Sequence, residues 1–405
     1  MARLFGTDGV RGVANTELTG ELAFRLGRAG AYVLTKETKH APRILVAMDT
    51  RISGDMLESA LVSGICSVGA HAVVAGVIPT PAVAYLVRKY RLDAGVMISA
   101  SHNPVEYNGI KFFNNQGYKL SDALEDEIEN IIMSHPEILP SPTGIGLGTK
   151  EYAEDALDDY IAFLTRTTTE KFDGIKVALD CANGAAYKAA PIAMLDLGAS
   201  LCIIHNEPDG TNINDKCGST HMDDLKEMVV QNGADIGFAF DGDADRCLAV
   251  DEKGNLIDGD KILAICGLDM KERGALAKDT IVGTVMSNLG LTMMGKEKDI
   301  HILQTSVGDR YVLERMLADG YNIGGELMGV FGMLLMIPLA SVLYTLAREF
   351  TDKRLAQRNI PEEKLQDHPP ELQSRFKQNR ERKKRRRLQK MKEQFLKNQK
   401  EKEDQ

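Results

Sequence analysis

The sequence lacks paired cysteines. Six cysteines are scattered along the chain with no C-x-x-C pair and no spacing typical of a zinc site: Cys66, Cys181, Cys202, Cys217, Cys247 and Cys266. A disulfide scaffold is therefore excluded, and we expect reduced thiols in a cytosolic protein. The first residues, MARLFG, also lack the apolar core of a secretory signal, so we expect residues 1–326 to be cytoplasmic.

The composition gives no sign of a disordered or collagen-like chain. The 405 residues are 43% hydrophobic and 26% charged, which is ordinary for a protein with a packed core, and the length predicts two to three domains. Charge is distributed unevenly, because residues 327–405 hold 19 Lys/Arg and 11 Asp/Glu out of 49 and 58. Residues 1–326 therefore carry 30 basic and 47 acidic side chains, which argues against nonspecific nucleic-acid binding there.

Short apolar runs alternate with helical patterns from residue 40 to 330. This alternation predicts an α/β fold with parallel or mixed sheets. Helices are expected to begin at Thr19 and at Ser121, each followed by apolar residues near the 3.6 period. The expected strands are Arg43–Asp49, Ala72–Gly76, Gly95–Ile98, Ile175–Asp180, Leu201–Ile204, Ile236–Phe240, Ile281–Val285 and Ile302–Val307.

Composition also predicts the divisions of the chain. Ser134–Lys150 is rich in Pro and Gly, and Asp251–Gly259 is rich in turn residues, so three α/β modules are expected. Leu327–Ala347 has no charged residue and meets the length criterion of roughly 20 residues for a transmembrane helix, with a buried core helix as the alternative. The basic run 382–387 in the polar tail after it favours a solvated or lipid-facing helix.

Three carboxylates follow the expected strand Ile236–Phe240, in the run DGDADR. Asp241, Asp243 and Asp245 alternate, so a curled loop can turn all three toward one cation. Their hard oxygen ligands favour Mg²⁺ or Ca²⁺ over zinc, and an exposed acidic turn is the alternative. A calcium EF-hand is rejected because Arg246 stands where the sharp turn needs Gly, and because the flanks are typical of strands.

A second motif, ISASHNP, follows the strand expected at Gly95–Ile98. Pro104 pushes Asn103 toward an extended conformation, so a tight turn can present Ser101, although a serine there is more often a simple turn residue. No G-x-S-x-G elbow surrounds it, which disfavours acyl transfer. With the three aspartates, however, a serine that carries a phosphate would form a phosphoryl-transfer site, to which Arg11, Lys111 and Arg246 could add positive charge or handle a proton.

The ordered motifs FGTDGVRG, ISASHNP, NGIKFF, DGDADR, TSVGDRYV and GGE resemble those of the α-D-phosphohexomutases over residues 1–326. The opening FGTDGVRG is most similar to the bacterial phosphoglucosamine mutase family, with phosphomannomutases and phosphoglucomutases as the alternatives. The resemblance implies interconversion of glucosamine 6-phosphate and glucosamine 1-phosphate in amino-sugar metabolism. It also implies three related mixed-sheet domains, at residues 1–150, 151–255 and 256–326.

The resemblance further assigns roles to residues of this chain. Ser101 would be the phosphoserine, and its phosphate would share Mg²⁺ with the three aspartates, while glucosamine 1,6-bisphosphate would be the bound intermediate and activator. Lys111 matches the family position proposed for proton handling, and Arg11, His102 and Arg246 match positions near the phosphate. Gly325 and Glu326 match the start of the loop that grips the sugar hydroxyls. Sugar phosphates would be the partners, and the family suggests a homodimer.

The sequence departs from the family after Glu326. The family continues with Gln-Ser-Gly-His and a fourth domain, whereas this chain continues with Leu327-Met328-Gly329-Val330, so the third domain is expected to be truncated and activity impaired. Residues 327–405 resemble instead the last membrane helix (327–347) and tail (348–405) of an autoinducer-2-exporter-type permease. One span cannot keep both the body and the basic tail in the cytosol, which favours two joined reading frames. A catalytically dead, membrane-associated fusion is the remaining alternative.

Overall fold

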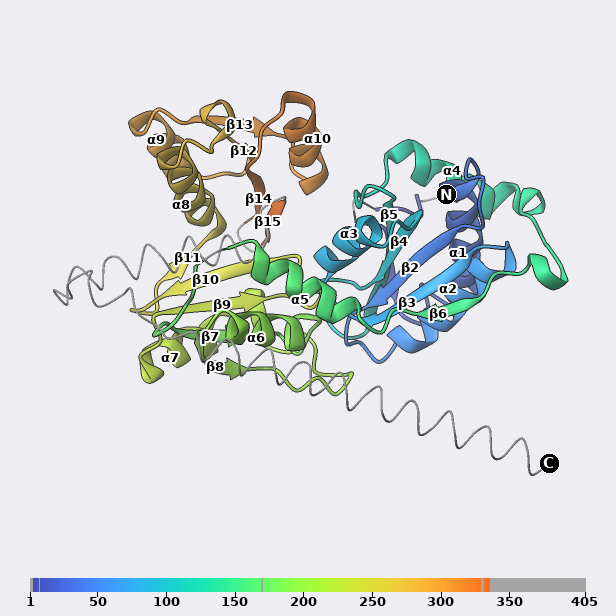
Figure 1. Ribbon diagram of the computed structural model, residues 1–405, viewed down its shortest axis with the longest axis horizontal. Helices are drawn as coiled ribbons and strands as arrows, with labels where there is room; N and C mark the ends of the chain where they lie inside the picture. The colour runs from blue at the N-terminus through green and yellow to red at the C-terminus, as the bar shows by residue number, and fades with distance from the viewer. Residues whose placement is uncertain (1–2, 7, 169, 329–330, 336–405) are drawn as a thin grey trace, which may run out of the picture. The chain divides into compact units, whose positions relative to one another are not determined.

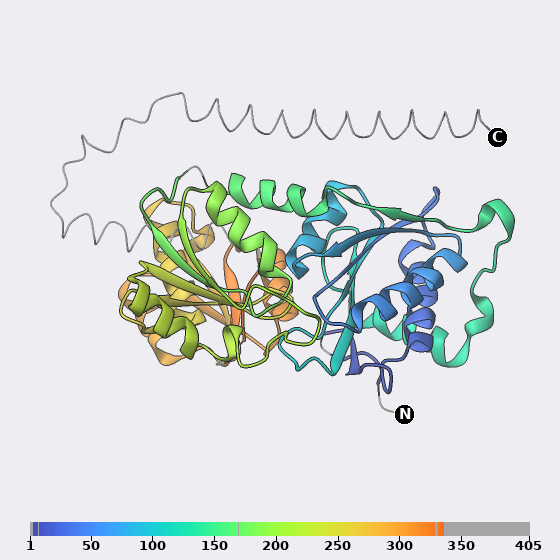
Figure 2. The same ribbon diagram turned by 90° about the horizontal axis from the view of Figure 1, so that it is seen from below.

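The computed structural model describes residues 3–6, 8–168, 170–328 and 331–335. These residues form three sheets in chain order, and helices accompany each sheet (Figures 1 and 2). Each sheet combines parallel strands with one strand or more that runs antiparallel to its neighbour. The predicted α/β class with mixed sheets is therefore confirmed.

The first sheet has six strands in the order β1-β5-β4-β2-β3-β6. Strands β2, β3, β4 and β6 are parallel, whereas β5 runs antiparallel to both β4 and β1. The elements of this part are β1 (Val10–Val13), α1 (Gly20–Thr35), β2 (Arg43–Met48), α2 (Gly54–Ser67), β3 (His71–Val77), α3 (Thr80–Lys89), β4 (Ala94–Ile98), β5 (Tyr107–Asn114), α4 (Asp122–Ser134) and β6 (Lys150–Tyr152).

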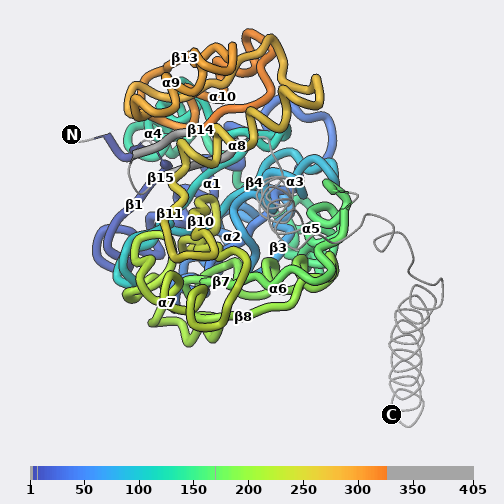
Figure 3. The backbone as a smooth tube through the Cα atoms, turned by 90° about the vertical axis from the view of Figure 1, so that its left-hand side faces the viewer, coloured from blue at the N-terminus to red at the C-terminus, as the bar shows by residue number. Residues whose placement is uncertain are grey.

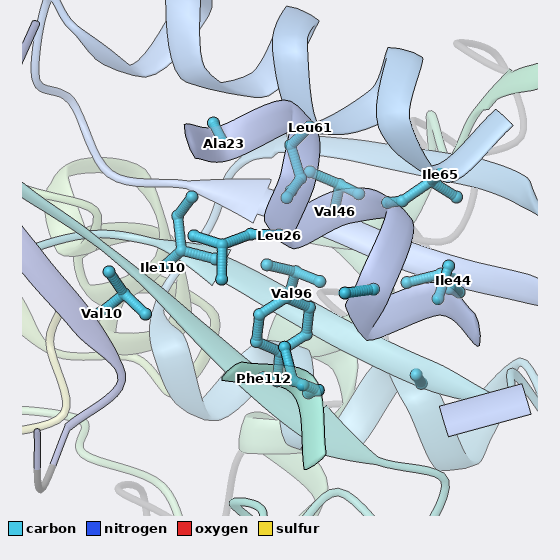
Figure 4. Close-up of a cluster of buried hydrophobic side chains, with 14 of the residues drawn as sticks. Val10, Ala23, Leu26, Ile44, Val46, Leu61, Ile65, Val96, Ile110 and Phe112 are labelled. Atoms are coloured by element: carbon cyan, nitrogen blue, oxygen red, sulfur yellow. The ribbon is translucent and has the colours of Figure 1, made fainter. Parts of the chain in front are cut away.

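The core of this part lies on both faces of its sheet. Phe112, Val96 and Ile110 of the sheet pack with Leu26 of α1 and Leu61 of α2 on one face (Figure 4), and α3 covers the other face together with α5 (Ala156–Arg166). Helices α1 and α2 approach closely because both carry glycine at the contact. A Cβ at position 64 of α2 would lie 2.2 Å from the carbonyl oxygen of Phe24, so only glycine fits there.

The second sheet has the order β11-β10-β9-β7-β8. Its three parallel strands β7, β8 and β9 are followed by β10, which turns back antiparallel along β9 and pairs Cys247 with Phe240. The elements are β7 (Lys176–Asp180), α6 (Ala186–Asp196), β8 (Ser200–Ile204), α7 (Asp223–Asn232), β9 (Ile236–Phe240), β10 (Cys247–Asp251) and β11 (Leu256–Ile257).

The third sheet has the order β13-β12-β14-β15. Strands β12, β13 and β14 are parallel, and β15 is antiparallel to β14. In Figure 3, β13 of this part is drawn in orange. The elements are α8 (Gly259–Glu272), β12 (Thr280–Thr284), α9 (Leu289–Glu297), β13 (His301–Thr305), α10 (Asp309–Asp319), β14 (Gly324–Met328) and β15 (Phe331–Leu335).

The helix predicted over residues 327–347 is wrong where the structure describes it. Residues 327–328 end β14, and Phe331–Leu335 form β15, which pairs Leu334 with Gly325 and Met333 with Glu326. An uncharged apolar run is compatible with a buried strand as well as with a helix, so the run alone could not distinguish the two. No helix within the described part of the chain has the length and apolar character to cross a bilayer. Residues 336–405, including the basic run and the rest of the permease-like segment, lie outside the described residues.

Candidate active site

Two hairpin turns carry the strongest motifs of the sequence, and the fold brings them together. Ser101 lies in the connection from β4 to β5, and Asp241 lies in the connection from β9 to β10. The Ser101 hydroxyl donates a hydrogen bond to Asp241 Oδ2 over 2.5 Å, and both residues are buried. The serine and the aspartate cluster predicted from separate motifs therefore belong to one site.

Ser101 is held in an uncommon backbone conformation. Its φ of +55° is in the left-handed region, which costs a residue with a side chain about 1–3 kcal/mol. The backbone N–H of Ser101 donates to Ser99 Oγ over 2.9 Å, and that hydroxyl donates to the buried Asp49 carboxylate over 2.6 Å. These bonds stabilise the strained turn and present the Ser101 side chain to the aspartates.

Arg51 is the main support of the turn, and we did not predict it from the sequence. Its side chain is fully buried, and its guanidinium makes an ion pair with Asp49 through Nε at 2.9 Å. The other N–H groups donate to backbone carbonyl oxygens of the turn: Ser101 at 2.9 Å, Asn103 at 2.7 Å, Tyr107 at 3.0 Å and Pro104. All five donors of the guanidinium are thus used on one loop and its neighbouring strand end.

The second sheet also supports the turn. Asn214 Nδ2 donates to the carbonyl oxygen of Ser101 over 2.8 Å and to that of Asn103 over 3.1 Å. Gly242 lies so close that a Cβ there would stand 2.6 Å from the Ser101 oxygen. Asn214 and Gly242, both from the second part of the chain, therefore hold the serine loop in place.

The three aspartates form a compact buried cluster. One carboxylate oxygen from each lies within 4.8 Å of the others. Asp243 Oδ2 accepts from Lys111 Nζ over 2.7 Å and from Thr80 Oγ1 over 2.6 Å, and Lys111 reaches Asp245 at 3.3 Å. The remaining oxygens, Asp243 Oδ1 and Asp245 Oδ1, are buried without a hydrogen-bond partner among the described residues.

The charges of this cluster are not balanced by the protein alone. Burial, together with the nearby Asp245 and Asp243, raises the pKa of Asp241 to about 8. Burial would also raise the pKa of Asp243, but the ammonium of Lys111 outweighs it and holds that pKa below the usual value. Hard oxygen ligands, excess negative charge and two unpartnered buried oxygens are what a Mg²⁺ site requires, so the residues fit this ion.

Lys111 faces the cluster as a cation. Burial disfavours its ammonium, but Asp243, Asp245 and Asp8 outweigh burial and raise its pKa above the usual value. The predicted site residue therefore lies where expected, and its charge is fixed by carboxylates that come from the second sheet and from the N-terminal loop. This arrangement favours a lasting positive charge on Lys111 that compensates the aspartates.

Arg246, His102 and Arg11 complete the predicted set. Arg246 Nη1 lies 2.5 Å from His102 Nδ1. Burial, and to a lesser extent the positive charges of Arg246 and Arg11, lower the pKa of His102 to about 4. His102 is thus neutral near pH 7, and an Nδ1 that accepts from Arg246 leaves the proton on Nε2. Arg11 is paired with Asp8 at 2.5 Å.

Gly325 and Glu326, the predicted sugar-binding residues, lie in β14 of the third sheet. Gly325 is buried, and the structure does not describe the side chain of Glu326. Their role in sugar binding stays a prediction.

Comparison with known proteins also identifies three α/β domains in the part of the chain that the structure describes. Phosphoglucomutase/phosphomannomutase α/β/α domains I, II and III match residues 2–138, 155–254 and 258–334. Phosphoglucosamine mutases from Ruminiclostridium cellulolyticum and Acetivibrio thermocellus are 66% and 62% identical over 329 residues, 81% of this chain and 73% of each relative.

A solved structure supports the assignment. The crystal structure of a phosphoglucomutase/phosphomannomutase family protein from Burkholderia thailandensis has a TM-score of 0.74 at 25% identity, over 86% of this chain and 76% of its own. The matched domains contain both hairpin turns and the residues that meet there. The chain belongs to the phosphoglucosamine mutase family, a group of isomerases among the phosphohexomutases.

Proposed function

We propose that this chain interconverts glucosamine 6-phosphate and glucosamine 1-phosphate, with Ser101 as the carrier of the transferred phosphate. The relatives that are 62% and 66% identical are named for this activity. The observation that carries the proposal for this chain is the hydrogen bond from Ser101 to Asp241, inside a cluster of three aspartates and facing Lys111.

The proposed reaction has two half-reactions. In the first, the anomeric hydroxyl oxygen of glucosamine 6-phosphate bonds to the phosphorus on Ser101, the bond from phosphorus to Oγ breaks, the sugar hydroxyl loses its proton and Oγ gains one. The product is glucosamine 1,6-bisphosphate. In the second, Oγ takes the 6-phosphate by the reverse chemistry, which releases glucosamine 1-phosphate and restores the phosphoserine.

The residues of the site suit these steps. Asp241, Asp243 and Asp245 would hold Mg²⁺, which when bound supplies positive charge to the oxygens of the transferred phosphoryl group. Lys111 is positioned as an ammonium beside the aspartates and is our candidate to supply the proton that Oγ gains. Neutral His102, with its proton on Nε2, and the guanidinium of Arg246 are candidates to hold phosphate oxygens.

Phosphoryl transfer to the protein tests this proposal directly. The full chain is incubated with glucosamine 1,6-bisphosphate and Mg²⁺, and the modified residue is located by mass spectrometry. We expect one phosphate at Ser101, none in Ser101→Ala, and unchanged labelling in Ser121→Ala, which removes a hydroxyl on the same domain that makes no capping hydrogen bond. Undiminished labelling of Ser101→Ala would show that another residue is the carrier.

The sugar preference is a separate question. Mannose and glucose phosphates are the competing substrates suggested by the domain family, whose members include phosphomannomutases and phosphoglucomutases. Rates measured with the three sugar 1-phosphates in competition decide between them, and we expect the glucosamine compound to be preferred.

A further inference from the structure

A second group of metal-ligand side chains lies in the second sheet, apart from the aspartates of the active site. Asp180 ends β7, His205 follows β8, and Cys217 lies in the loop that leads to α7. One ligand atom of each lies within 4.8 Å of the other two. The phosphoryl-transfer chemistry proposed above uses none of these three residues.

Burial and unsatisfied atoms mark this cluster as more than a chance contact. Asp180 and Cys217 are fully buried. His205 Nδ1 lies 3.0 Å from Asp180 Oδ2, an ion pair when the imidazole is protonated, and a bound cation would take the place of that proton. Two atoms of nearby residues, Asn206 Oδ1 and Ser219 Oγ, are buried without a hydrogen-bond partner in the described part of the chain. The aspartate cluster of the active site carries the same signature at Asp243 and Asp245.

The surroundings orient the three side chains as ligands. Backbone N–H groups of Ala182 and Gly218 each donate to Asp180 over 2.9 Å, which fixes its carboxylate. The other ring nitrogen of His205, Nε2, lies 3.4 Å from Asp224 Oδ2. With a metal bound, a carboxylate on the far nitrogen would hold the proton there and leave the lone pair of Nδ1 for the ion, as in many metal sites.

We propose that Asp180, His205 and Cys217 form a structural site for a transition-metal dication, with Zn²⁺ as the expected ion. Carboxylate, imidazole and thiolate ligands together favour zinc, whereas Mg²⁺ takes oxygen ligands only. A water molecule would supply the fourth ligand, since the His205 side chain is partly exposed to solvent.

The position of the site gives it a structural consequence. His205 and Cys217 are the two ends of one loop, and Asp180 ties both ends to β7. This loop carries Asn214, which donates to the carbonyl oxygens of Ser101 and Asn103. In addition, Gly210 of the same loop accepts from the N–H of Ile52 over 2.8 Å. A metal at the loop ends would therefore brace the segment that supports the serine turn.

Co²⁺ is a suitable probe because its bond to a thiolate gives a charge-transfer absorption band. The full chain is stripped with a chelator and titrated with Co²⁺ in the presence of excess Mg²⁺, which occupies the aspartate cluster. We expect one equivalent of Co²⁺ with the thiolate band, displaced by one equivalent of Zn²⁺, and a rise in melting temperature on Zn²⁺ binding. Absence of the band in wild-type protein, or binding without displacement by Zn²⁺, would overturn the proposal.

Variants locate the bound ion. Cys217→Ser should lose the band, whereas Cys202→Ser, which alters a cysteine of β8 outside the cluster, should keep it. A band that persists in Cys217→Ser would contradict the assignment. Because Cys217 is buried and its variant could unfold, Asp224→Asn provides an exposed alternative, expected to weaken Zn²⁺ affinity about 10- to 100-fold. Its matched control is Asp223→Asn, the neighbouring exposed carboxylate, and equal affinity in these two variants would refute the predicted role of Asp224 in orienting His205.

Discussion

Arg51 Nη2 donates a 2.9 Å hydrogen bond to the carbonyl oxygen of Ser101, so a buried cation 50 residues away holds the backbone of the proposed phosphate carrier. The same guanidinium is anchored by Asp49 and satisfies three further carbonyl groups of the turn. The left-handed conformation of Ser101 is thus maintained by a residue that has no direct role in the chemistry.

Replacing Arg51 should therefore affect turnover more than substrate binding. Arg51→Lys keeps the charge, but its three N–H donors are all on one nitrogen. They cannot reach all the carbonyl oxygens that the planar guanidinium bonds through its separate nitrogens. We expect kcat to fall about 10- to 100-fold with little change in KM, and the free energy of unfolding to fall by about 2–4 kcal/mol. Steady-state kinetics and denaturant unfolding measure both. Arg25→Lys, in an exposed pair with Glu21, is the control and should change neither.

Thr80 should affect the Mg²⁺ affinity of the proposed metal site although it is not itself a proposed ligand. Its hydroxyl donates to Asp243 Oδ2, and its removal in Thr80→Val leaves Lys111 as the only donor to that oxygen among the described residues. Since such supporting bonds orient metal ligands, we expect Mg²⁺ affinity to fall about 10-fold while KM for the sugar phosphate stays the same. Activity measured against Mg²⁺ concentration gives the affinity.

The matched control for Thr80 is Thr35→Val. Thr35 is also buried, but its hydroxyl donates to the Ala31 carbonyl inside α1. The same loss of Mg²⁺ affinity in Thr35→Val would mean that the effect reflects general destabilisation.

Sequence patterns predicted the parallel strands other than β6 and β14, together with the two motifs, because both kinds of signal are local. Ile236–Phe240 is a strand with the bounds expected, and Thr19 caps α1 through a hydrogen bond from Leu22 N. The antiparallel strand β5 was not predicted, because buried polar residues such as Lys111 interrupt its apolar run. Lys111 is tolerated there because Asp243 and Asp245, more than 130 residues away, accept from its ammonium, and no local pattern shows such partners.

Other parts of the site left a weaker signal in the sequence. Arg51 follows a strand in the run DTR, where an arginine is usually exposed, and its burial depends on four carbonyl oxygens of the distant segment 101–107 as well as on Asp49. The cluster of Asp180, His205 and Cys217 is also invisible to spacing rules, since Asp180 ends β7 whereas His205 and Cys217 lie at opposite ends of the loop after β8. The apolar run after Glu326 was interpreted as a helix because pairing with β14 is a property of the fold and not of the run itself.

Glu125 should make stability depend on pH. It is buried in α4 beside Arg3, and burial outweighs the attraction of Arg3 and raises its pKa from 4.5 to about 7. The folded protein therefore binds a proton between pH 4.5 and 7 that the unfolded chain releases, so stability falls as pH rises through this window. Glu125→Gln should be more stable than wild type at pH 8, by up to about 3 kcal/mol, and similar near pH 4.5.

Melting temperatures at several pH values measure this effect. The control is Asp126→Asn, which removes an exposed carboxylate that also contacts Arg3. Equal pH dependence in wild type and Glu125→Gln would show that the Glu125 carboxyl does not titrate in this window.

Lys119 makes ion pairs with Asp8 near the N-terminus and with Asp309 of α10, and it should contribute to both stability and activity. Its ammonium lies 2.6 Å from Asp8 and 2.7 Å from Asp309, and all three side chains are largely buried. Lys119→Met leaves two carboxylates close together with no cation between them, so we expect a loss of about 2–4 kcal/mol of stability. Because Asp8 also pairs with Arg11, a shift of Asp8 should displace Arg11 and lower kcat.

The double variant Lys119→Met/Asp309→Asn removes one of the repelling charges and should recover part of the stability. Lys36→Met, which breaks an exposed pair with Glu127, should cost less than about 1 kcal/mol. If the double variant is no more stable than Lys119→Met, repulsion between Asp8 and Asp309 is not the cause of the loss.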